Sequence, residues 1–206
     1  MKQKYFIDSH KGITFLAILA MMAWYGRWEN ATAWVYLALH GTYGWLWVLK
    51  SRIFPDKQWE QPCSIWYGLY IWAGLSLYWI APYLITRYDL HAPAWLLGLS
   101  ISMYIMGVFL HFGADMQKHT ALMMTPGQLI HTGFFKYTRN PNYLGELLIY
   151  LGFSILAMHW APLAAIGLFI VVIWVPNMIK KDRSLSRYEQ FEHYKRRTKL
   201  LIPFIL

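Results

Sequence analysis

The chain is poor in the residues from which soluble proteins build disulfides and charged surfaces. Cys63 is the only cysteine among 206 residues, which excludes an internal disulfide and any site made of several thiolates. Charged residues make up 14% of the chain, and 10 acidic residues stand against 19 lysines and arginines. These shortages argue against a water-soluble domain.

Several signatures of soluble enzymes are also missing. The chain has no glycine-rich dinucleotide fingerprint and no phosphate-binding loop, which disfavours a Rossmann dehydrogenase or a nucleotide hydrolase. It has no Gly-x-Ser-x-Gly elbow for nucleophilic hydrolysis. The histidines His111, His119 and His131 lack the paired spacing of zinc or iron ligands, so we expect no metal site.

Apolar and aromatic residues dominate what the chain does contain. Apolar residues make up 57% of it, and 12 residues are tryptophan. We therefore predict an all-α, polytopic integral-membrane helical bundle of about six transmembrane helices, forming one membrane domain over residues 1–206. Each of the six apolar stretches is near the ~20 residues that a bilayer-crossing helix needs. The stretches cover residues 12–26, 31–49, 63–85, 93–113, 143–159 and 161–179.

The distribution of basic residues predicts the orientation in the membrane. With a cytoplasmic N-terminus, every lysine and arginine except Arg27 and Arg87 lies in a cytoplasmic segment. This pattern agrees with the positive-inside rule and, for an even number of spans, places both termini in the cytoplasm. Topology and anionic lipid or a phosphorylated ligand account for the net charge of +9, so we expect no nucleic-acid partner. The membrane would be the bacterial inner membrane, or the endoplasmic reticulum in a eukaryote.

A charged helix start stands at residues 133–146, which read GFFKYTRNPNYLGE. Asn140 is suited to cap a helix that begins at Pro141, because the proline ring pre-sets the helical backbone angle. Arg139 would lie beside the free N–H groups and the positive end of the helix dipole, where an anionic cofactor is favoured. Polar residues follow on one face of the helix at four-residue intervals, namely Asn142, Glu146 and Tyr150.

Polar residues interrupt two of the apolar stretches. In the second stretch, His40 and Tyr43 either bond to a neighbouring helix or supply a proton to a bound substrate. At the end of the fourth, His111, Asp115 and Lys118 follow helical spacing. If the helix continues that far, they form a polar stripe at the cytoplasmic mouth. Otherwise they mark a solvated helix end.

Residues 180–199 are the most charged part of the chain. We expect them to form a helix on which an apolar and aromatic stripe recurs every three residues, and this helix has two possible placements. It either lies on the membrane surface or folds back to close the cytoplasmic mouth, presenting arginines to the same anion as Arg139. The stripe consists of Leu185, Tyr188, Phe191 and Tyr194.

Three motifs, in this order, resemble the C-terminal catalytic region of the steroid 5-alpha-reductase family and in particular its bacterial relatives. The similarity begins near Met103 and continues to the end of the chain. The motifs are Ala114-Asp-Met-Gln-Lys118, the stretch 133–146, and Tyr194-Lys-Arg-Arg-Thr-Lys-Leu-Leu-Ile-Pro203.

The resemblance implies an integral-membrane, NADPH-dependent oxidoreductase that reduces a carbon–carbon double bond conjugated to a carbonyl in a lipid or steroid-like substrate. It implies that residues 93–206 bind the cofactor and that residues 1–92 hold the substrate side, with Glu146 catalytic. Residues 39–43 are only distantly similar to the family, and within them we take His40 or Tyr43 as the candidate proton donor. Arg139, Arg183 and Arg187 would face the phosphates. The full implied cofactor-binding set is His111, Asp115, Lys118, Arg139, Asn142, Tyr143, Glu146, Arg183, Arg187 and Tyr194.

A more distant similarity leads to the isoprenylcysteine carboxyl and phospholipid methyltransferases, which use S-adenosylmethionine. It consists of the Arg-x-Pro-x-Tyr pattern at residues 139–143 and the tyrosine and proline near the end of the chain. Those enzymes carry a pair of glutamates after the last span, where this chain has Lys181 and Asp182. The reductase hypothesis is therefore favoured, and a non-catalytic membrane sensor or scaffold is the third alternative.

Overall fold

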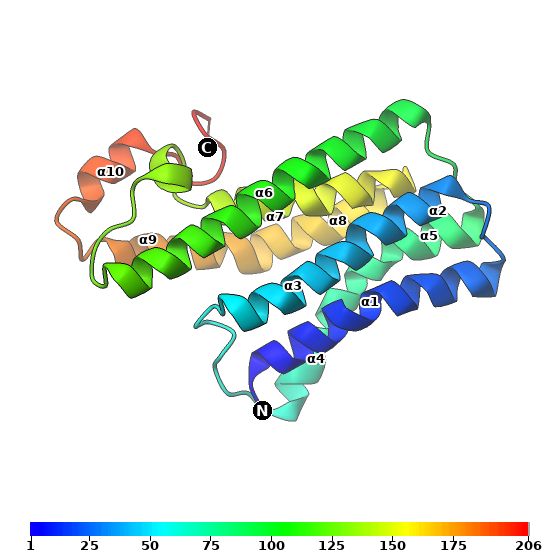
Figure 1. The fold of residues 1–206 in the computed structure, drawn as a ribbon, viewed down its shortest axis with the longest axis horizontal. Coiled ribbons are helices and arrows are strands. Elements are labelled where there is room, and N and C mark those ends of the chain that lie inside the picture. Colours follow the sequence, from blue (N-terminus) through cyan, green and yellow to red (C-terminus); the bar gives the residue numbers. More distant parts are fainter. Residues whose placement is uncertain (206) are drawn as a thin grey trace. The chain divides into compact units, whose positions relative to one another are not determined.

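The computed structural model describes residues 1–205, and every regular element in that range is a helix (Figure 1). The predicted all-α class is confirmed. The elements, with η for 3-10 and π turns, are α1 Gln3–Tyr25, α2 Ala31–Tyr36, η1 Leu37–Gly41, α3 Thr42–Ile53, α4 Ile65–Ser76, η2 Leu77–Trp79, α5 Ile80–Tyr88, α6 Ala94–Met124, η3 Gly133–Lys136, α7 Pro141–Ser154, η4 Ile155–Ala157, α8 Trp160–Phe169, η5 Ile170–Trp174, α9 Val175–Leu185 and α10 Phe191–Arg197.

Four helical segments are long and apolar enough to cross a bilayer, which makes the chain an integral membrane protein. They are Gln3–Tyr25, Ile65–Tyr88, Ala94–Met124 and Trp160–Leu185. The predicted count of six is not confirmed by these four. Residues 31–49 and 143–159 are also helical, but the 14 residues of α7 extend only about 21 Å, less than the ~30 Å of a hydrocarbon core.

The chain divides into two compact units, each built from two pieces of sequence. Unit 1 contains Met1–Tyr104 and Tyr150–Ile166, and unit 2 contains Ile105–Ile149 and Gly167–Leu206. The single domain predicted over residues 1–206 stays a prediction.

In unit 1, α1 packs against α3, α4 and α5. The crossing of α1 and α3 is close because Gly44 on α3 has no side chain: a Cβ there would collide with the backbone oxygen of Lys11. Caps fix where the neighbouring helices begin. The Asn30 side chain accepts a hydrogen bond from the Ala33 N–H at the start of α2, and Ser64 accepts one from Tyr67 at the start of α4.

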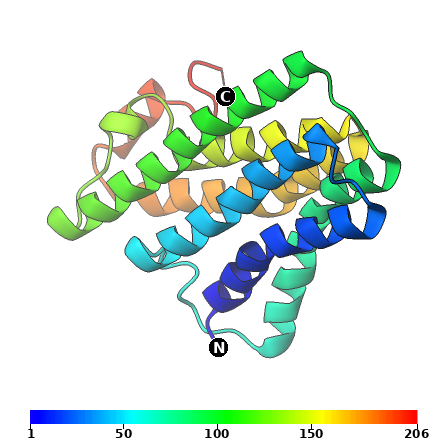
Figure 2. The same ribbon diagram turned by 45° about the vertical axis from the view of Figure 1, so that its right-hand side comes forward.

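In unit 2, α6 and α7 cross where two glycines face each other. A Cβ on Gly107 would lie 2.7 Å from the Gly145 oxygen, and a Cβ on Gly145 would collide with the His111 backbone nitrogen. Small residues at such a crossing let two helix backbones approach closely. Both views show α6 as one uninterrupted helix (Figures 1 and 2), so the helix continues past Asp115 and Lys118 as the polar-stripe hypothesis required.

The C-terminal part of unit 2 folds back on the segment before α7. The expected single helix over residues 180–199 is wrong, because α9 ends at Leu185 and turns separate it from α10. Both views place α10 beside η3 (Figures 1 and 2). Two residues of the apolar stripe, Phe191 and Tyr194, are buried with Leu129, and the other two, Leu185 and Tyr188, are partly buried against them.

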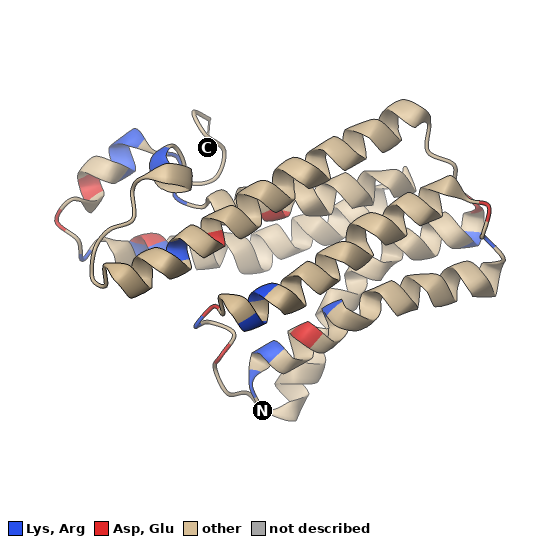
Figure 3. Cartoon of the chain, in the orientation of Figure 1, with Lys and Arg blue, Asp and Glu red and all other residues tan. Residues whose placement is uncertain are grey.

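Charged residues lie mainly near helix ends and in loops in both units (Figure 3). In unit 1, Lys2 and Lys4 pair with Glu60 near the N-terminus, and Arg27 lies 3.3 Å from Asp89. The exposed faces of the long helices carry many apolar side chains, such as Ile105 and Phe109 on α6. This surface is what a helix facing lipid requires.

Candidate functional site

Helix α7 begins at Pro141, as predicted. Asn140 accordingly occupies the capping position and is fully buried, but its side chain bonds elsewhere. Its Oδ1 accepts a hydrogen bond from Lys181 Nζ at 3.1 Å, and its Nδ2 donates to the Leu200 oxygen at 2.9 Å. Asn140 therefore ties the start of α7 to α9 and to the C-terminal segment.

Arg139 is buried and makes its contacts within the protein. Its Nε lies 3.0 Å from both carboxylate oxygens of Asp182, and its Nη2 lies 3.0 Å from Oδ2. Its Nη1 donates to the Thr198 oxygen at 2.9 Å. The guanidinium thus closes a buried ion pair on α9 and holds the end of α10. The predicted contact between Arg139 and a phosphate stays a proposal.

The C-terminal segment pairs with the residues before α7 like a short strand. The Arg139 N–H donates to the Lys199 oxygen at 2.9 Å, and the Thr138 hydroxyl donates to the Leu201 oxygen at 2.9 Å. Tyr194 is buried and donates its hydroxyl to the Phe135 oxygen at 2.8 Å, and burial raises its pKa above the ordinary value. These contacts give Tyr194 a positioning role in the observed structure.

A buried polar cluster connects α6 and α7. His111 and Asp115 are 2% and 4% exposed, so the polar stripe is not a solvated helix end. His111 Nδ1 lies 3.0 Å from the Asn142 backbone oxygen, and its Nε2 lies 4.0 Å from Asp115 Oδ2. The side-chain oxygen of Asn142 is buried and has no hydrogen-bond partner among residues 1–205. Such an atom costs free energy unless a ligand bonds to it.

Lys181 is a component of this region that the sequence analysis did not assign to the cofactor site. Its Nζ donates to the Arg139 oxygen at 2.6 Å, besides its bond to Asn140. The charges of Asp115, Lys118 and Asp182 also act on it. Lys181 therefore brings a positive charge to the start of α7. Its position after the last apolar stretch was the only signal in the sequence.

A groove of about 370 Å³ lies beside the Arg139–Asp182 pair. Arg183 and Lys195 on its wall are exposed, whereas Arg139 is buried. Arg187 is not part of the wall and donates to the Tyr188 hydroxyl at 3.1 Å. The groove is lined by Arg139, Ile179, Asp182, Arg183, Ser186, Phe191, Glu192, Lys195 and Leu200.

The remaining predicted residues of unit 2 lie on α6 and α7. The Tyr143 ring contacts Trp174, with centroids 5.5 Å apart. Glu146 is half-buried on α7, one helical turn beyond Asn142, and Lys118 is half-buried on α6, one turn beyond Asp115. The start of α7 and the middle of α6 thus gather the central part of the predicted cofactor set in one unit.

The predicted proton donors lie in unit 1 and are buried. His40 Nδ1 lies 2.8 Å from the Tyr36 hydroxyl, and its ring stacks on Phe153 with centroids 4.3 Å apart. Tyr43 is fully buried, and its ring lies 4.3 Å from Lys11 Nζ. Their assignment as proton donors stays a prediction.

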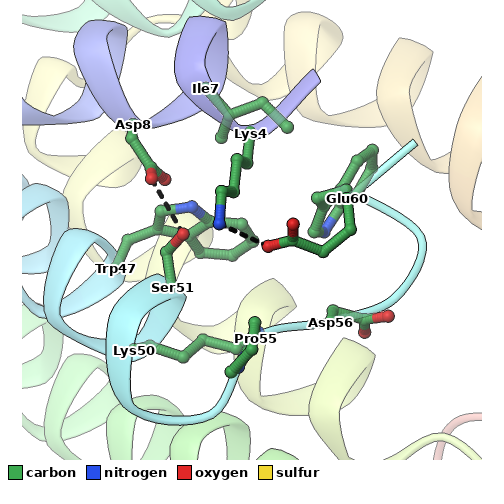
Figure 4. Close-up of a pocket in the computed structure, with 10 residues that line it drawn as sticks. Lys4, Ile7, Asp8, Trp47, Lys50, Ser51, Pro55, Asp56 and Glu60 are labelled. Atoms are coloured by element: carbon green, nitrogen blue, oxygen red, sulfur yellow. Dashed lines mark hydrogen bonds and ion pairs between the residues drawn. The ribbon is translucent and has the colours of Figure 1, made fainter. Parts of the chain in front are cut away.

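A small cavity near the N-terminus has no room for a substrate. Its volume is about 10 Å³, and Figure 4 shows Lys4 and Ser51 on its wall. Ser51 donates to Asp8 at 2.8 Å, and Lys4 pairs with Glu60 (Figure 4). Among residues 1–205, no three His, Cys, Asp or Glu side chains come together as metal ligands.

The chain is similar in sequence to proteins of known families. Residues 65–206 match the family model described as 3-oxo-5-alpha-steroid 4-dehydrogenase, which extends the similarity well ahead of Met103. The chain is 31% identical over 78 residues to the steroid 5-alpha-reductase DET2 of Solanum lycopersicum, covering 35% of this chain and 28% of that protein. It is 26% identical over 129 residues to the methanethiol S-methyltransferase of Crocosphaera subtropica, covering 59% of this chain and 48% of that protein.

The matched regions therefore span less than half the length of either relative. No solved structure matches the chain. The family model covers both the α6–α7 polar cluster and the groove beside α9 and α10, and it extends over more than half of the chain. The chain belongs to the 3-oxo-5-alpha-steroid 4-dehydrogenase family.

Proposed function

We propose that this protein is a membrane-embedded reductase that uses NADPH to reduce a carbon–carbon double bond conjugated to a carbonyl in a lipid or steroid-like substrate. The observation that carries the proposal is the buried Asn142 Oδ1, which has no hydrogen-bond partner among residues 1–205 and lies within the region that the reductase family model matches. A nicotinamide carries a carboxamide whose N–H groups suit this acceptor.

His111 and Asp115 are positioning residues in this proposal. His111 bonds to the Asn142 backbone oxygen and fixes the first turn of α7, so that the Asn142 amide keeps one orientation. Glu146 follows Asn142 on the same face of the helix and would flank the nicotinamide end. NADPH supplies the hydride when it is bound.

The charged groove would hold the phosphate-bearing end of the cofactor. Arg183 and Lys195 offer exposed cationic groups on its wall, where they can pair with phosphate oxygens. Arg139 is already paired with Asp182, so its role is to hold the wall in place. Lys181 adds positive charge beside the start of α7, where backbone N–H groups also favour an anion.

The substrate would be lipophilic and would reach the protein from the bilayer. Reduction of the conjugated double bond also needs a proton from the protein, and His40 and Tyr43 are the donors that the sequence suggests. Both lie in unit 1 among aromatic side chains. An apolar and aromatic surrounding suits a lipid or steroid skeleton.

A second function is favoured by one specific finding. The methanethiol S-methyltransferase relative aligns over 129 residues, more than the 78 of the plant reductase. A membrane methyltransferase would bind S-adenosylmethionine, which also presents polar groups to a buried amide.

Thermal unfolding of the detergent-purified protein separates these functions. We expect NADPH to raise the unfolding temperature more than NADH does, and S-adenosylmethionine to leave it unchanged. NADPH consumption with a 4-en-3-one steroid as probe should follow. Stabilisation by S-adenosylmethionine alone would overturn the reductase proposal in favour of the methyltransferase, and stabilisation by none of the three would contradict both.

A further inference from the structure

Unit 2 carries an exposed surface around Tyr137 that is both apolar and basic. Phe204 is 78% exposed, Ile205 is 76% exposed and Tyr137 is 49% exposed. The rings of Tyr137 and Phe204 contact each other with centroids 5.6 Å apart, and Lys136 Nζ lies 5.1 Å from the Tyr137 ring centroid. These four residues and the exposed Lys199 make up what we call the Tyr137 surface.

Backbone hydrogen bonds hold the two halves of this surface together. The Lys199 N–H donates to the Tyr137 oxygen at 3.2 Å, and the Arg139 N–H donates to the Lys199 oxygen at 2.9 Å. The chain then turns back in a loop after α10 (Figures 1 and 2), and the Ile205 N–H donates to the Ile202 oxygen at 3.2 Å. The exposed apolar side chains are therefore presented by hydrogen-bonded backbone.

The charge around the Tyr137 surface has one sign. Neither residues 116–145 nor residues 193–205 contain an aspartate or a glutamate. The exposed lysines and arginines of these two segments are Lys136, Lys195, Arg196, Arg197 and Lys199. A cluster of this kind beside a membrane attracts anionic lipid. The partner that fits the surface is therefore negatively charged and has an apolar part.

The Tyr137 surface lies near the end of a membrane-spanning segment. The segment Trp160–Leu185 ends three residues after Asp182, and Asp182 forms the buried pair with Arg139, two residues after Tyr137. Lipid headgroups lie at the end of such a segment. Apolar side chains at this level reach the boundary between headgroups and acyl chains, and lysines beside them reach the lipid phosphates.

We propose that the Tyr137 surface docks onto anionic lipid headgroups of the cytoplasmic leaflet. Phe204 and Ile205 enter the boundary between headgroups and acyl chains, and Lys136 and Lys199 pair with lipid phosphates. A soluble anion would pair with the lysines but would leave the two apolar side chains in water, whereas a lipid accommodates both. This interaction does not depend on the proposed reductase function.

Docking would also stabilise the start of α7. The segment that carries Lys199 accepts the Arg139 N–H, and the next residue, Leu200, accepts Asn140 Nδ2 at 2.9 Å. A lipid that binds this segment only in the folded protein raises the unfolding temperature. The wild-type protein should therefore be more stable in nanodiscs that contain phosphatidylglycerol than in nanodiscs of phosphatidylcholine alone.

A fluorescent label at position 205 tests the docking directly. Cys63→Ser removes the only cysteine, and Ile205→Cys then carries a nitrobenzoxadiazole label, whose emission moves to shorter wavelength in apolar surroundings. In phosphatidylcholine nanodiscs, we expect the emission to move to shorter wavelength as the fraction of phosphatidylglycerol rises. Salt should oppose this shift, because the screening length falls from about 10 Å at 0.1 M to about 3 Å at 1 M.

The double variant Lys136→Gln/Lys199→Gln tests the role of charge. The phosphatidylglycerol fraction that gives half of the shift should rise at least about 5-fold, the effect of roughly one basic residue near an anionic surface. The control is Arg52→Gln/Lys57→Gln, which removes the same charge from exposed residues of unit 1 and should leave the shift unchanged. The unlabelled double variant should also lose the stabilisation by phosphatidylglycerol.

Three results would overturn the proposal. The first is an emission that does not respond to phosphatidylglycerol. The second is a Lys136→Gln/Lys199→Gln protein that responds like the wild type, or no more weakly than the control. The third is a shift of the same size when inorganic phosphate is added to the detergent-solubilised protein, because the surface would then bind a soluble anion instead of a lipid.

Discussion

Arg139 and Asp182 form a buried ion pair across 43 positions of the sequence, with Nε 3.0 Å from both carboxylate oxygens and side-chain exposures of 7% and 15%. The pair joins the segment just before α7 to the C-terminal part of α9. Since the carboxylate already neutralises the guanidinium, Arg139 supports the wall of the groove, and the exposed Arg183 and Lys195 supply its cationic character.

Asp182→Asn should destabilise the protein strongly. The substitution leaves a buried guanidinium without its carboxylate, which costs about 3–5 kcal/mol. Thermal unfolding in detergent should show a clear drop in the midpoint, with α10 and the C-terminal segment becoming sensitive to protease. Glu192→Gln, an exposed residue on the same groove, is the control and should change little. A wild-type midpoint for Asp182→Asn would mean that the pair contributes nothing measurable.

Asn142→Ala should weaken NADPH binding without lowering stability. Its side-chain oxygen has no hydrogen-bond partner among residues 1–205, so its removal sacrifices no internal bond, and the His111 bond goes to the backbone oxygen. Loss of a ligand hydrogen bond of about 1.4 kcal/mol corresponds to roughly 10-fold weaker binding. Titration calorimetry measures this directly. Unchanged affinity would remove Asn142 from the cofactor site.

Arg183→Ala should reduce the preference for NADPH over NADH. Arg183 is exposed on the groove wall, and one charge-assisted contact with a phosphate contributes about 1.5–3 kcal/mol. The affinity for NADPH should therefore fall roughly 10-fold or more while that for NADH falls less. Arg196→Ala on the outer side of α10 is the matched control, because Arg196 is exposed and not part of the groove. Equal losses for both dinucleotides would place the extra phosphate elsewhere.

Local features of the sequence predicted much of unit 2. The proline at position 141 indicated where α7 begins, and helical spacing brought His111 and Asp115 to one face of a continuing α6. The stripe of Tyr194 and its neighbours left two placements open, and in the structure Phe191 and Tyr194 are buried with Leu129. Such features depend on residues a few positions apart, so the sequence contains them in full.

Partners distant in the sequence could not be predicted in this way. Nothing near Arg139 indicates that its carboxylate is Asp182, and Lys11 looked like one more cytoplasmic lysine until its Tyr150 partner was seen. The break between α9 and α10 was not predicted, because the apolar residues of the stripe keep their three-residue spacing across the turn that separates the two helices. These features depend on tertiary packing, which a pattern along one helix does not contain.

Gly145→Ala should show how tightly α6 and α7 must approach for the polar cluster to form. A Cβ at position 145 would collide with the His111 backbone nitrogen and lie 2.7 Å from the Gly107 oxygen, so one helix must shift. Overpacking of this kind costs about 1–3 kcal/mol. The matched control is Gly167→Ala on α8, where an added Cβ meets nothing within 4 Å and better helix propensity contributes up to about 1 kcal/mol. A lower unfolding midpoint together with weaker NADPH binding in Gly145→Ala, and neither in Gly167→Ala, would link the helix crossing to the site. If Gly145→Ala keeps both properties of the wild type, the cluster of His111 and Asn142 does not depend on this close approach.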